Sequence, residues 1–241
     1  MRIRSATICG LAVLALIACE RPASSRPAAA PAQPSAYDLD KWHTEAPAIA
    51  AAGGAVVRHD FELTLSAKGE TVARFRSDDA NAWTYAARFD GICEMDRSCT
   101  FYVFRYVVPG TDLKPASLVV NDRGRPVAWI GDNVLPGKGG WIASGEPFED
   151  GHFEIDDLSQ AHPVRYAFDA ACVPDKWLSP DEVAVTCHND AITSAVTHET
   201  VKKVSDHAWR MGAHGDRATT TALQPFRPED LASLARIGFH H

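Results

Sequence analysis

The feature of this sequence that most constrains its fold is a two-residue alternation of apolar and polar side chains. It is clearest at 60–65, 83–89 and 152–156. An extended chain with this period places its apolar side chains on one face and its polar side chains on the other. Strands with one buried and one wet face are typical of antiparallel sheets. The side chains expected to share a buried face are, stretch by stretch, Phe61, Leu63 and Leu65; Trp83, Tyr85, Ala87 and Phe89; Phe153 and Ile155.

Further strands and turns continue this pattern along the chain. The run 100–108 is apolar on both faces, which predicts a central strand. Shorter candidate strands are 70–76, 117–121, 126–130 and 141–144. Turn signals are Asp90-Gly91, Asn121-Asp122-Arg123-Gly124, Pro136-Gly137, Gly139-Gly140 and Asp150-Gly151. Many short strands between regular turns predict a mainly β fold, an antiparallel sandwich or barrel-like, with short C-terminal helices; an α+β fold is the alternative.

Helices are expected in three places. Thr44 can cap an Ala-rich helix over 44–52. Apolar residues at helical spacing predict a second helix over 198–211 and a third from about residue 228. Neither of the last two could bury its apolar stripe alone, so both are expected to belong to the β-rich domain. The apolar positions are Val201, Val204, Ala208 and Met211 in the second helix and Leu231, Leu234 and Ile237 in the third, which Gly238 follows.

The N-terminus carries a different pattern. A basic start precedes an apolar run over 11–18, and Cys19 follows it directly. The run is shorter than the roughly 20 apolar residues of a membrane-spanning helix, and it fits the apolar region of a secretory signal peptide. The four residues Leu16-Ile17-Ala18-Cys19 resemble the lipobox of a bacterial lipoprotein. This resemblance covers only about the first 20 residues, and it implies cleavage before Cys19 and lipidation of its thiol.

The same resemblance implies a location. A Cys19 that carries several acyl chains, palmitate among them, would stay in a membrane. The family's inner-membrane retention rule prefers Asp at the next position, and Glu20 stands there, which favours the periplasmic face of the outer membrane in the bacterial cell envelope. Residues 20–36 are nearly all Pro, Ala and Ser, so they cannot form a core and would make a tether of about 50 Å.

The expected organisation follows from these three segments. Residues 1–18 are a signal peptide, 19–36 are the lipidated Cys and its Pro/Ala/Ser-rich tether, and 37–241 form a single disulfide-containing β-rich domain. The folded part has about 205 residues, which is ample for a hydrophobic core.

Export would make disulfides the expected state of the remaining cysteines. Two of them fall on the apolar faces of alternating stretches, 163–172 and 182–188, so they are expected to join neighbouring strands, with 173–181 as a loop. The other two would close a short loop. A four-Cys zinc site is the alternative, but the sequence lacks Cys-x-x-Cys spacing. The expected pairs are Cys172–Cys187 and Cys93–Cys99.

Charge and motifs narrow the function classes. The chain has 24 basic and 31 acidic residues and a net charge of −7, which disfavours nucleic-acid binding. It contains no G-x-S-x-G, S-x-x-K or H-E-x-x-H motif and no phosphate-binding glycine loop. His198-Glu199 begins like a zinc-protease helix, but Lys202 replaces the second histidine. We therefore assign no catalytic residue, no cofactor and no metal from the sequence.

Histidines offer one alternative to that assignment. His188, His198, His207 and His214 fall close together, with Asp190, Asp206 and Asp216 nearby. Imidazole and carboxylate groups serve as zinc ligands or as acid/base pairs. Their spacing matches no established ligand pattern, and His198 and His207 would lie on opposed sides of one helix. A solvated polar face is the favoured interpretation.

Acidic and tryptophan residues offer two more candidates. The carboxylates between 146 and 157 could hold calcium, although outward strand positions and a turn explain most of them. Trp141 and Trp177 lie beside loops, where an indole could stack on a sugar or anchor a protein partner; core packing is the competing interpretation. The acidic residues are Glu146, Glu149, Asp150, Glu154, Asp156 and Asp157.

The function expected from the sequence is that of a membrane-tethered periplasmic lipoprotein acting as a protein-binding module, for instance an inhibitor or immunity protein. Its expected partners are the membrane, through the lipid anchor, and a periplasmic protein. Candidate ligand-binding residues are Trp141, Trp177, Glu149 and Asp150. One alternative is an envelope hydrolase or metal-dependent enzyme that uses the 188–214 histidine cluster. The other is a peptidoglycan- or glycan-binding lipoprotein.

Overall fold

The computed structural model describes residues 45–93, 97–111, 114–147, 151–159, 163–189, 195–212 and 216–241. Two units divide the chain, Met1–Ser35 and Ala36–His241, and all described residues belong to the second.

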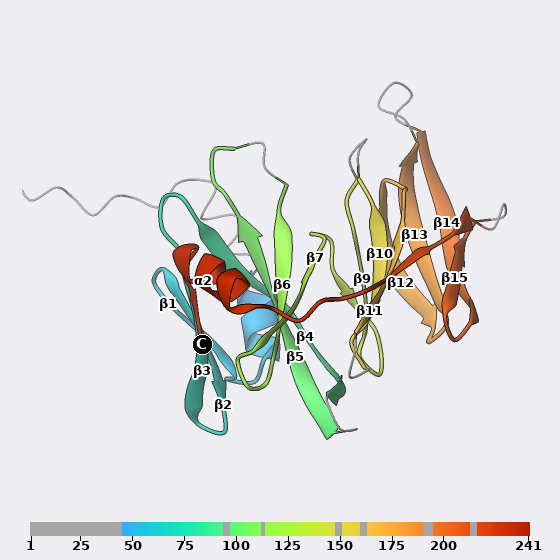
Figure 1. Ribbon diagram of the computed structural model, residues 1–241. Helices are drawn as coiled ribbons and strands as arrows, with labels where there is room; N and C mark the ends of the chain where they lie inside the picture. The colour runs from blue at the N-terminus through green and yellow to red at the C-terminus, as the bar shows by residue number, and fades with distance from the viewer. Residues whose placement is uncertain are drawn as a thin grey trace, which may run out of the picture. The chain divides into compact units, whose positions relative to one another are not determined.

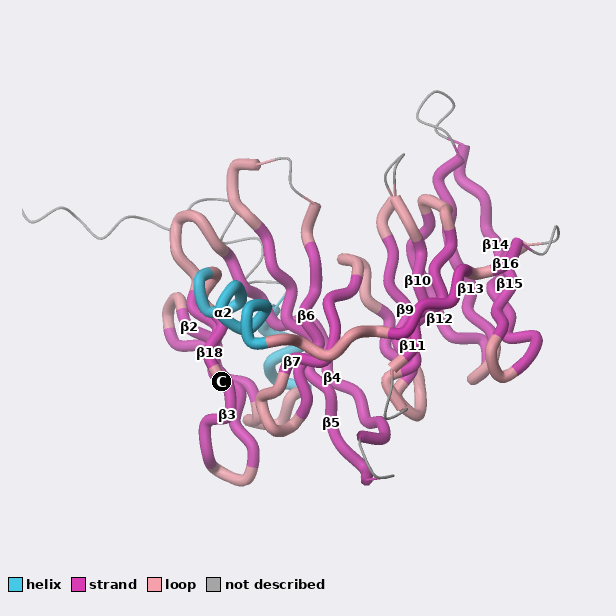
Figure 2. Tube along the Cα trace, viewed as in Figure 1, coloured by secondary structure: helices cyan, strands magenta, loops and turns pink. Residues whose placement is uncertain are grey.

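Four antiparallel sheets, A to D, make up this unit, so the fold is mainly β, as the alternation predicts (Figures 1 and 2). Sheet A contains β1 (Val56–His59), β2 (Glu62–Ala67), β3 (Glu70–Arg76) and β18 (Phe239–His240). Sheet B contains β4 (Ala82–Cys93), β5 (Arg97–Val107), β6 (Ala116–Asn121) and β7 (Pro126–Ile130). Sheet C contains, in spatial order, β17 (Thr219–Ala222), β11 (Val164–Phe168), β10 (Phe153–Asp157), β9 (Trp141–Gly145) and β8 (Leu135–Pro136). Sheet D contains β12 (Cys172–Ser179), β13 (Glu182–Asn189), β14 (Ala195–Ser205), β15 (Ala208–Met211) and β16 (Asp216–Arg217).

Three buried apolar clusters lie between these sheets. The A/B core includes Leu63, Phe75, Trp83, Phe104 and Leu118. The B/C core includes Phe101, Val103, Val119, Ile130 and Ile142. The C/D core includes Phe153, Ile155, Tyr166, Val185 and Trp209. Sheets B and C each contribute to two cores, so the sheets stack in the order A, B, C, D.

β5 shows why a strand in this stack is apolar on both faces. Phe104 belongs to the A/B core, while its neighbour Val103 belongs to the B/C core. Successive side chains of a strand point to opposite faces, so a strand of an inner sheet contacts two cores. The predicted central strand at 100–108 is confirmed, since β5 lies between β4 and β6.

β4 departs from the predicted alternation at one residue. The register with β5 shifts between Tyr85 and Ala87, as it does at a β-bulge. Tyr85 therefore belongs to the A/B core, whereas Phe89 belongs to the B/C core. The expectation that 83–89 buries one face is wrong, because the bulge moves the later side chains to the other side of the sheet.

Two further local predictions are wrong. Phe61 lies in the turn between β1 and β2 and is 54% exposed, so it does not share the buried face of Leu63. Gly91 lies within β4, not in a turn, and pairs with Cys99. A Cβ at Gly91 would stand 2.8 Å from the Cα atom of Gly140. The glycine at position 91 therefore allows the backbone of β4 to approach the backbone at Gly140, and it does not form a turn.

Two of the three expected helices are confirmed. One helix covers residues 45–51, and α2 (Pro228–Arg236) lies near the C-terminus. The helix predicted over 198–211 is wrong, because this stretch forms β14, a two-residue turn and β15. The β-branched residues of this stretch favour extended structure, and pairing of β14 with β13 over eight residues supplies the hydrogen bonds that a helix would have made locally.

Candidate functional site

An extended segment near the C-terminus, residues 223–227, connects sheet C with α2 and is called the strap (Figure 1). It begins after β17 at the edge of sheet C, where the backbone N–H of Leu223 donates to the carbonyl of Pro163 over 2.8 Å. After α2 the chain pairs with sheet A, where Phe239 lies opposite Phe75. The last strand of the chain therefore completes the sheet that its first three strands form.

A pocket of about 730 Å³, partly open to solvent, lies between the strap, β7, α2 and one residue of β11. We call it the strap pocket. Its volume is within the range of roughly 300–1,000 Å³ that is usual for ligand sites. Its apolar lining consists of Val127, Ala128, Trp129, Leu223, Pro225, Phe226, Leu234 and Ile237. Its polar lining consists of Arg165, Gln224, Arg227, Asp230 and Ser233.

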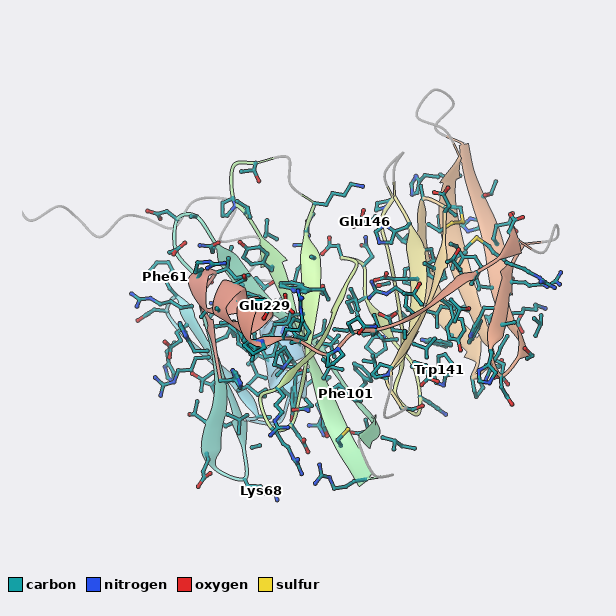
Figure 3. All side chains as sticks on the ribbon, in the orientation of Figure 1. Phe61, Lys68, Phe101, Trp141, Glu146 and Glu229 are labelled. Carbon is teal, nitrogen blue, oxygen red and sulfur yellow. A yellow bond between two sulfur atoms is a disulfide. The ribbon has the colours of Figure 1, made fainter. Side chains whose placement is uncertain are left out.

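Local sequence signals fix the start of α2 beside the strap. Pro228 stands in the first turn, where a missing N–H costs nothing, and Glu229 and Asp230 complement the positive end of the helix (Glu229 is labelled in Figure 3). The backbone N–H of Arg227 donates to Asp230 Oδ2 over 2.9 Å, and this hydrogen bond lowers the pKa of Asp230. Asp230 in the first turn of α2, held by this hydrogen bond, therefore forms part of the pocket wall.

The apolar face of α2 packs as the sequence predicts. Leu231, Leu234 and Ile237 join the A/B core. Gly238 ends the helix at φ +90°, and a Cβ there would lie 2.2 Å from the carbonyl oxygen of Arg76. Only glycine fits this close approach, so the packing that holds α2 in place also fixes the position of the pocket.

Arg165 of β11 forms the polar end of the strap pocket. Its Nε and Nη2 atoms donate to the two carboxylate oxygens of Asp156, each over 2.9 Å. Nη2 also donates to the backbone carbonyl of Trp129, and Nη1 lies 3.0 Å from Glu154 Oε2. The guanidinium is therefore held by two carboxylates of sheet C and by one carbonyl of sheet B.

The carboxylates behind Arg165 are buried, which corrects the prediction of a wet face on the strand at 152–156. Glu154 and Asp156 are each 1% exposed. Glu154 Oε1 accepts hydrogen bonds from the backbone of Gly131 over 2.8 Å and from Ser144 Oγ over 2.9 Å. The polar face of β10 therefore faces sheet B and not solvent. Hydrogen bonds to charged side chains join sheets B and C there.

Asp156 shares the guanidinium of Arg165 with Glu154 in this buried cluster, and burial is the main influence on its pKa. Burial raises the pKa of Asp156 to about 7, against the hydrogen bonds and the charge of Arg165, which lower it. The nearby charge of Glu154 raises it further. Asp156 therefore takes up a proton near neutral pH.

Folding stability should depend on pH through this group. The folded state keeps a proton on Asp156 between about pH 4 and pH 7, where the unfolded state has released it. The free energy of unfolding should therefore fall as pH rises through this range, by at most about 1.4 kcal/mol per pH unit from Asp156. Urea unfolding of the wild type and of Asp156→Asn at several pH values measures this contribution of Asp156 to the free energy of unfolding. The free energy of unfolding of the wild type minus that of Asp156→Asn should fall as pH rises through this range, and a difference that stays constant would contradict the assignment.

The charged groups around the strap pocket are already engaged within the protein. Arg165 is held by its carboxylates, and Arg227 lies 3.1 Å from Glu229 and 3.3 Å from Asp230 through its Nη1 and Nε atoms. What the pocket offers a ligand is mainly apolar contact area around Trp129 and Phe226. Such a surface suits apolar side chains better than a small polar substrate.

The two tryptophans proposed as binding residues are half-buried at the C/D core (Trp141 is labelled in Figure 3). The ring centroid of Trp141 lies 5.6 Å from that of Trp209, and Lys203 Nζ lies 5.1 Å from the Trp141 centroid. Trp177 Nε1 donates to the carbonyl of Leu135 over 3.2 Å. Both indoles therefore take part in packing between sheets C and D.

The acidic candidates are spread between buried and undescribed positions. Glu149 and Asp150 lie outside the described residues. Glu146 is 5% exposed and pairs with Lys114 over 3.1 Å (Glu146 is labelled in Figure 3). Asp157 is 3% exposed and accepts a hydrogen bond from the backbone of Ser159 over 3.0 Å. The expected outward strand position is wrong for Asp157, because β10 is buried along its whole length.

Three of the four histidine candidates lie on strands and a turn, not on a helix. His188 of β13 and His198 of β14 are exposed on one face of sheet D, and His207 lies in the turn before β15. His214 lies outside the described residues. In the part of the chain that the structure describes, no group of three or more His, Cys, Asp or Glu side chains is arranged to hold a metal ion.

The cysteines of sheet D lie directly opposite each other. Cys172 pairs with Cys187 in the β12–β13 hairpin, and their sulfur atoms are 1.99 Å apart in a disulfide bond. The loop predicted over 173–181 is wrong, because most of it forms β12, an edge strand in which Pro174 is tolerated. The side chain of Cys93 lies outside the described residues, so its bond with Cys99 stays a prediction.

No protein-family model, curated protein or solved structure matches this chain. None of the helices in the described ranges has the length and apolar character needed to cross a membrane.

The strap pocket did not follow from the sequence pattern. Its elements are far apart in the chain, and irregular segments such as 223–227 have no periodicity. One signal was present for its polar residues, since the period of two in 152–156 and 163–172 puts Asp156 and Arg165 opposite the apolar faces of these stretches. The structure pairs these two residues directly across β10 and β11.

Proposed function

We propose that this chain is a membrane-tethered binding protein of the bacterial cell envelope, which holds a protein partner by apolar side chains inserted into the strap pocket. The observation that carries the proposal is the pocket itself, about 730 Å³ in volume and lined mainly by apolar side chains. Binding energy at protein interfaces concentrates where an anchor residue fills such a pocket.

A protein partner fits the chemistry of the pocket better than a small polar ligand does. Small-molecule sites orient their ligands with a few convergent polar groups. Here Arg165 and Asp230 already have partners within the chain. An apolar anchor needs no such groups, and the opening to solvent beside the strap gives a partner's surface access. An envelope-acting enzyme or toxin is the partner class we propose, with this chain as its inhibitor or immunity protein.

The pocket can be tested by filling it. Ser233 is an exposed residue of α2 that lines the pocket, so Ser233→Trp should occupy the space with little effect on folding. Ala232 is exposed on another face of the same helix, which makes Ala232→Trp a matched control. Cross-linking in envelope extract followed by mass spectrometry should yield one partner with the wild type and Ala232→Trp. Ser233→Trp should lose that partner by tenfold or more.

Two results would overturn the proposal. Equal recovery of the partner with both tryptophan variants would place binding elsewhere on the chain. Failure of the wild type to yield any stoichiometric protein partner would shift the function towards a small-molecule or glycan ligand.

The membrane location rests on the lipobox resemblance at residues 16–19, which lie outside the described residues. Cys19→Ser should abolish labelling by an alkyne-tagged palmitate and release the protein from the membrane fraction, since the acyl chains hold it there. Cys9→Ser, in the expected signal peptide just before its apolar run, is the matched control and should leave labelling unchanged. Labelling of the Cys19→Ser variant would contradict lipidation at this residue.

A further inference from the structure

A second site lies on the outer face of sheet D, independent of the strap pocket. β13 and β14 pair with Thr186 opposite His198 and His188 opposite Val196. Alternate residues of a strand share a face, so these four side chains project from the same side of the sheet. The opposite side of the sheet carries Val185 and Cys187 of the C/D core. His188 and His198 are therefore diagonal neighbours on an exposed surface.

Hydrogen bonds fix which ring nitrogen of His198 is free. The Thr186 hydroxyl donates to the carboxylate of Asp175, with distances of 2.8 and 3.0 Å to its two oxygens. Its single proton is thereby used, and an ionised carboxylate cannot donate. The contact of 3.1 Å between Thr186 Oγ1 and His198 Nδ1 must then be a hydrogen bond donated by Nδ1. The neutral ring of His198 consequently carries its lone pair on Nε2.

Such an arrangement is typical of a metal-ligating histidine. The nitrogen that does not bind the metal usually donates to an oxygen acceptor, which fixes the tautomer and the ring orientation. The hydrogen bonds from His198 to Thr186 and from Thr186 to Asp175 supply this outer support on the exposed face of sheet D. Diagonal neighbours on an antiparallel pair have Cα atoms about 7–8 Å apart and Cβ atoms somewhat closer. Two imidazole rings can therefore reach one ion with bonds of about 2 Å.

We propose that His188 and His198 form a two-imidazole site for a divalent transition-metal ion on the outer face of sheet D, with water completing the coordination. Imidazole favours copper, zinc and nickel, and among these ions Cu²⁺ binds most tightly to a given set of nitrogen ligands. Thr186 is a positioning residue, since it acts on the metal through His198.

Equilibrium titration of the tag-free folded protein with Cu²⁺ alone, and separately with Zn²⁺ alone, tests the site. His188→Ala and His198→Ala should each weaken the tightest site by tenfold or more. Thr186→Val should weaken it by about tenfold, as loss of outer support does in other metal sites, whereas Thr186→Ser keeps the hydroxyl and should restore wild-type affinity. His207→Ala, at the exposed turn between β14 and β15 of the same sheet, is the control and should change nothing.

The outcome separates this site from other histidines of the chain. Unchanged affinity in both His188→Ala and His198→Ala would overturn the proposal and assign any binding to other residues. A variant that loses its near-ultraviolet circular dichroism is replaced by His188→Gln or His198→Gln, which keep a polar side chain of similar size. The proposal fails as well if the wild type binds neither ion in the micromolar range.

Discussion

Arg165→Met should lower the free energy of unfolding by about 3–5 kcal/mol, because it leaves Glu154 and Asp156 buried without their cation. Both carboxylates are 1% exposed, so water cannot replace the guanidinium at low cost. The loss should be smaller at pH 5 than at pH 8, since a protonated Asp156 is less costly to bury. Urea unfolding, followed by tryptophan fluorescence at both pH values, measures the effect.

Two comparisons make this result specific. Lys202 pairs with Glu182 over 3.1 Å on the exposed face of sheet D, and Lys202→Met should cost less than about 1 kcal/mol. Replacing the whole cluster, as Glu154→Gln, Asp156→Asn and Arg165→Met together, should cost less than Arg165→Met alone, because no unpaired charge is left. If the triple variant were the less stable one, electrostatic balance would not be the reason for the cluster.

Removal of the Cys172–Cys187 disulfide should also be strongly destabilising. The bond closes a loop with a sequence separation of 15, for which chain entropy predicts about 3 kcal/mol. The pair Cys172→Ala and Cys187→Ala should therefore shift the urea midpoint downwards under oxidising conditions. The fold should survive, since Val183 and Val185 of the same hairpin remain in the C/D core.

Matched single variants check the origin of this loss. Cys172→Ala alone also breaks the bond, so its cost should come close to that of the double variant. Val183→Ala removes apolar area of the same core without touching the bond and serves as the packing control. A loss below 1 kcal/mol in the double variant would show that the β12–β13 pairing already holds these residues together in the unfolded chain.

Residue alternation was enough to predict the fold class and most of the strands. The stretches 70–76, 117–121, 126–130 and 141–144 correspond closely to β3, β6, β7 and β9. α2 was also predictable, because Pro228, its apolar face and Gly238 are local signals that no distant contact overrides. These elements share one property: the information that specifies them lies within a few neighbouring residues.

Predictions failed where contacts with distant parts of the chain determine which side chains are buried or whether a stretch is a strand. In β4 a single bulged residue moves Phe89 to another core without any change in the sequence pattern. In β10 the polar residues Glu154 and Asp156 are buried, since the stack covers both faces of this inner strand. The stretch 198–211 fits a helical spacing, yet pairing with β13 makes it β14 and β15. Stacking order cannot be obtained from the alternation of a single strand.

The candidate site was less predictable than the fold. The strap pocket combines β7, Arg165, the strap and α2, and none of them carries a motif. Trp141 and Trp177 were chosen from the sequence because an indole can bind a sugar or a protein partner, but both pack against the C/D core. Only the histidine cluster led to a site proposed from the structure, on β13 and β14, of which β14 begins where a helix had been expected.

Site-specific photo-cross-linking in living cells tests the proposed function most directly. Gln224 is an exposed residue of the strap and lines the pocket, so a benzoylphenylalanine at this position would lie at the proposed interface. We predict one protein adduct, which persists with Ala232→Trp and disappears with Ser233→Trp. An adduct that survives Ser233→Trp, or the absence of any adduct from position 224, would contradict binding of a protein partner at the strap pocket.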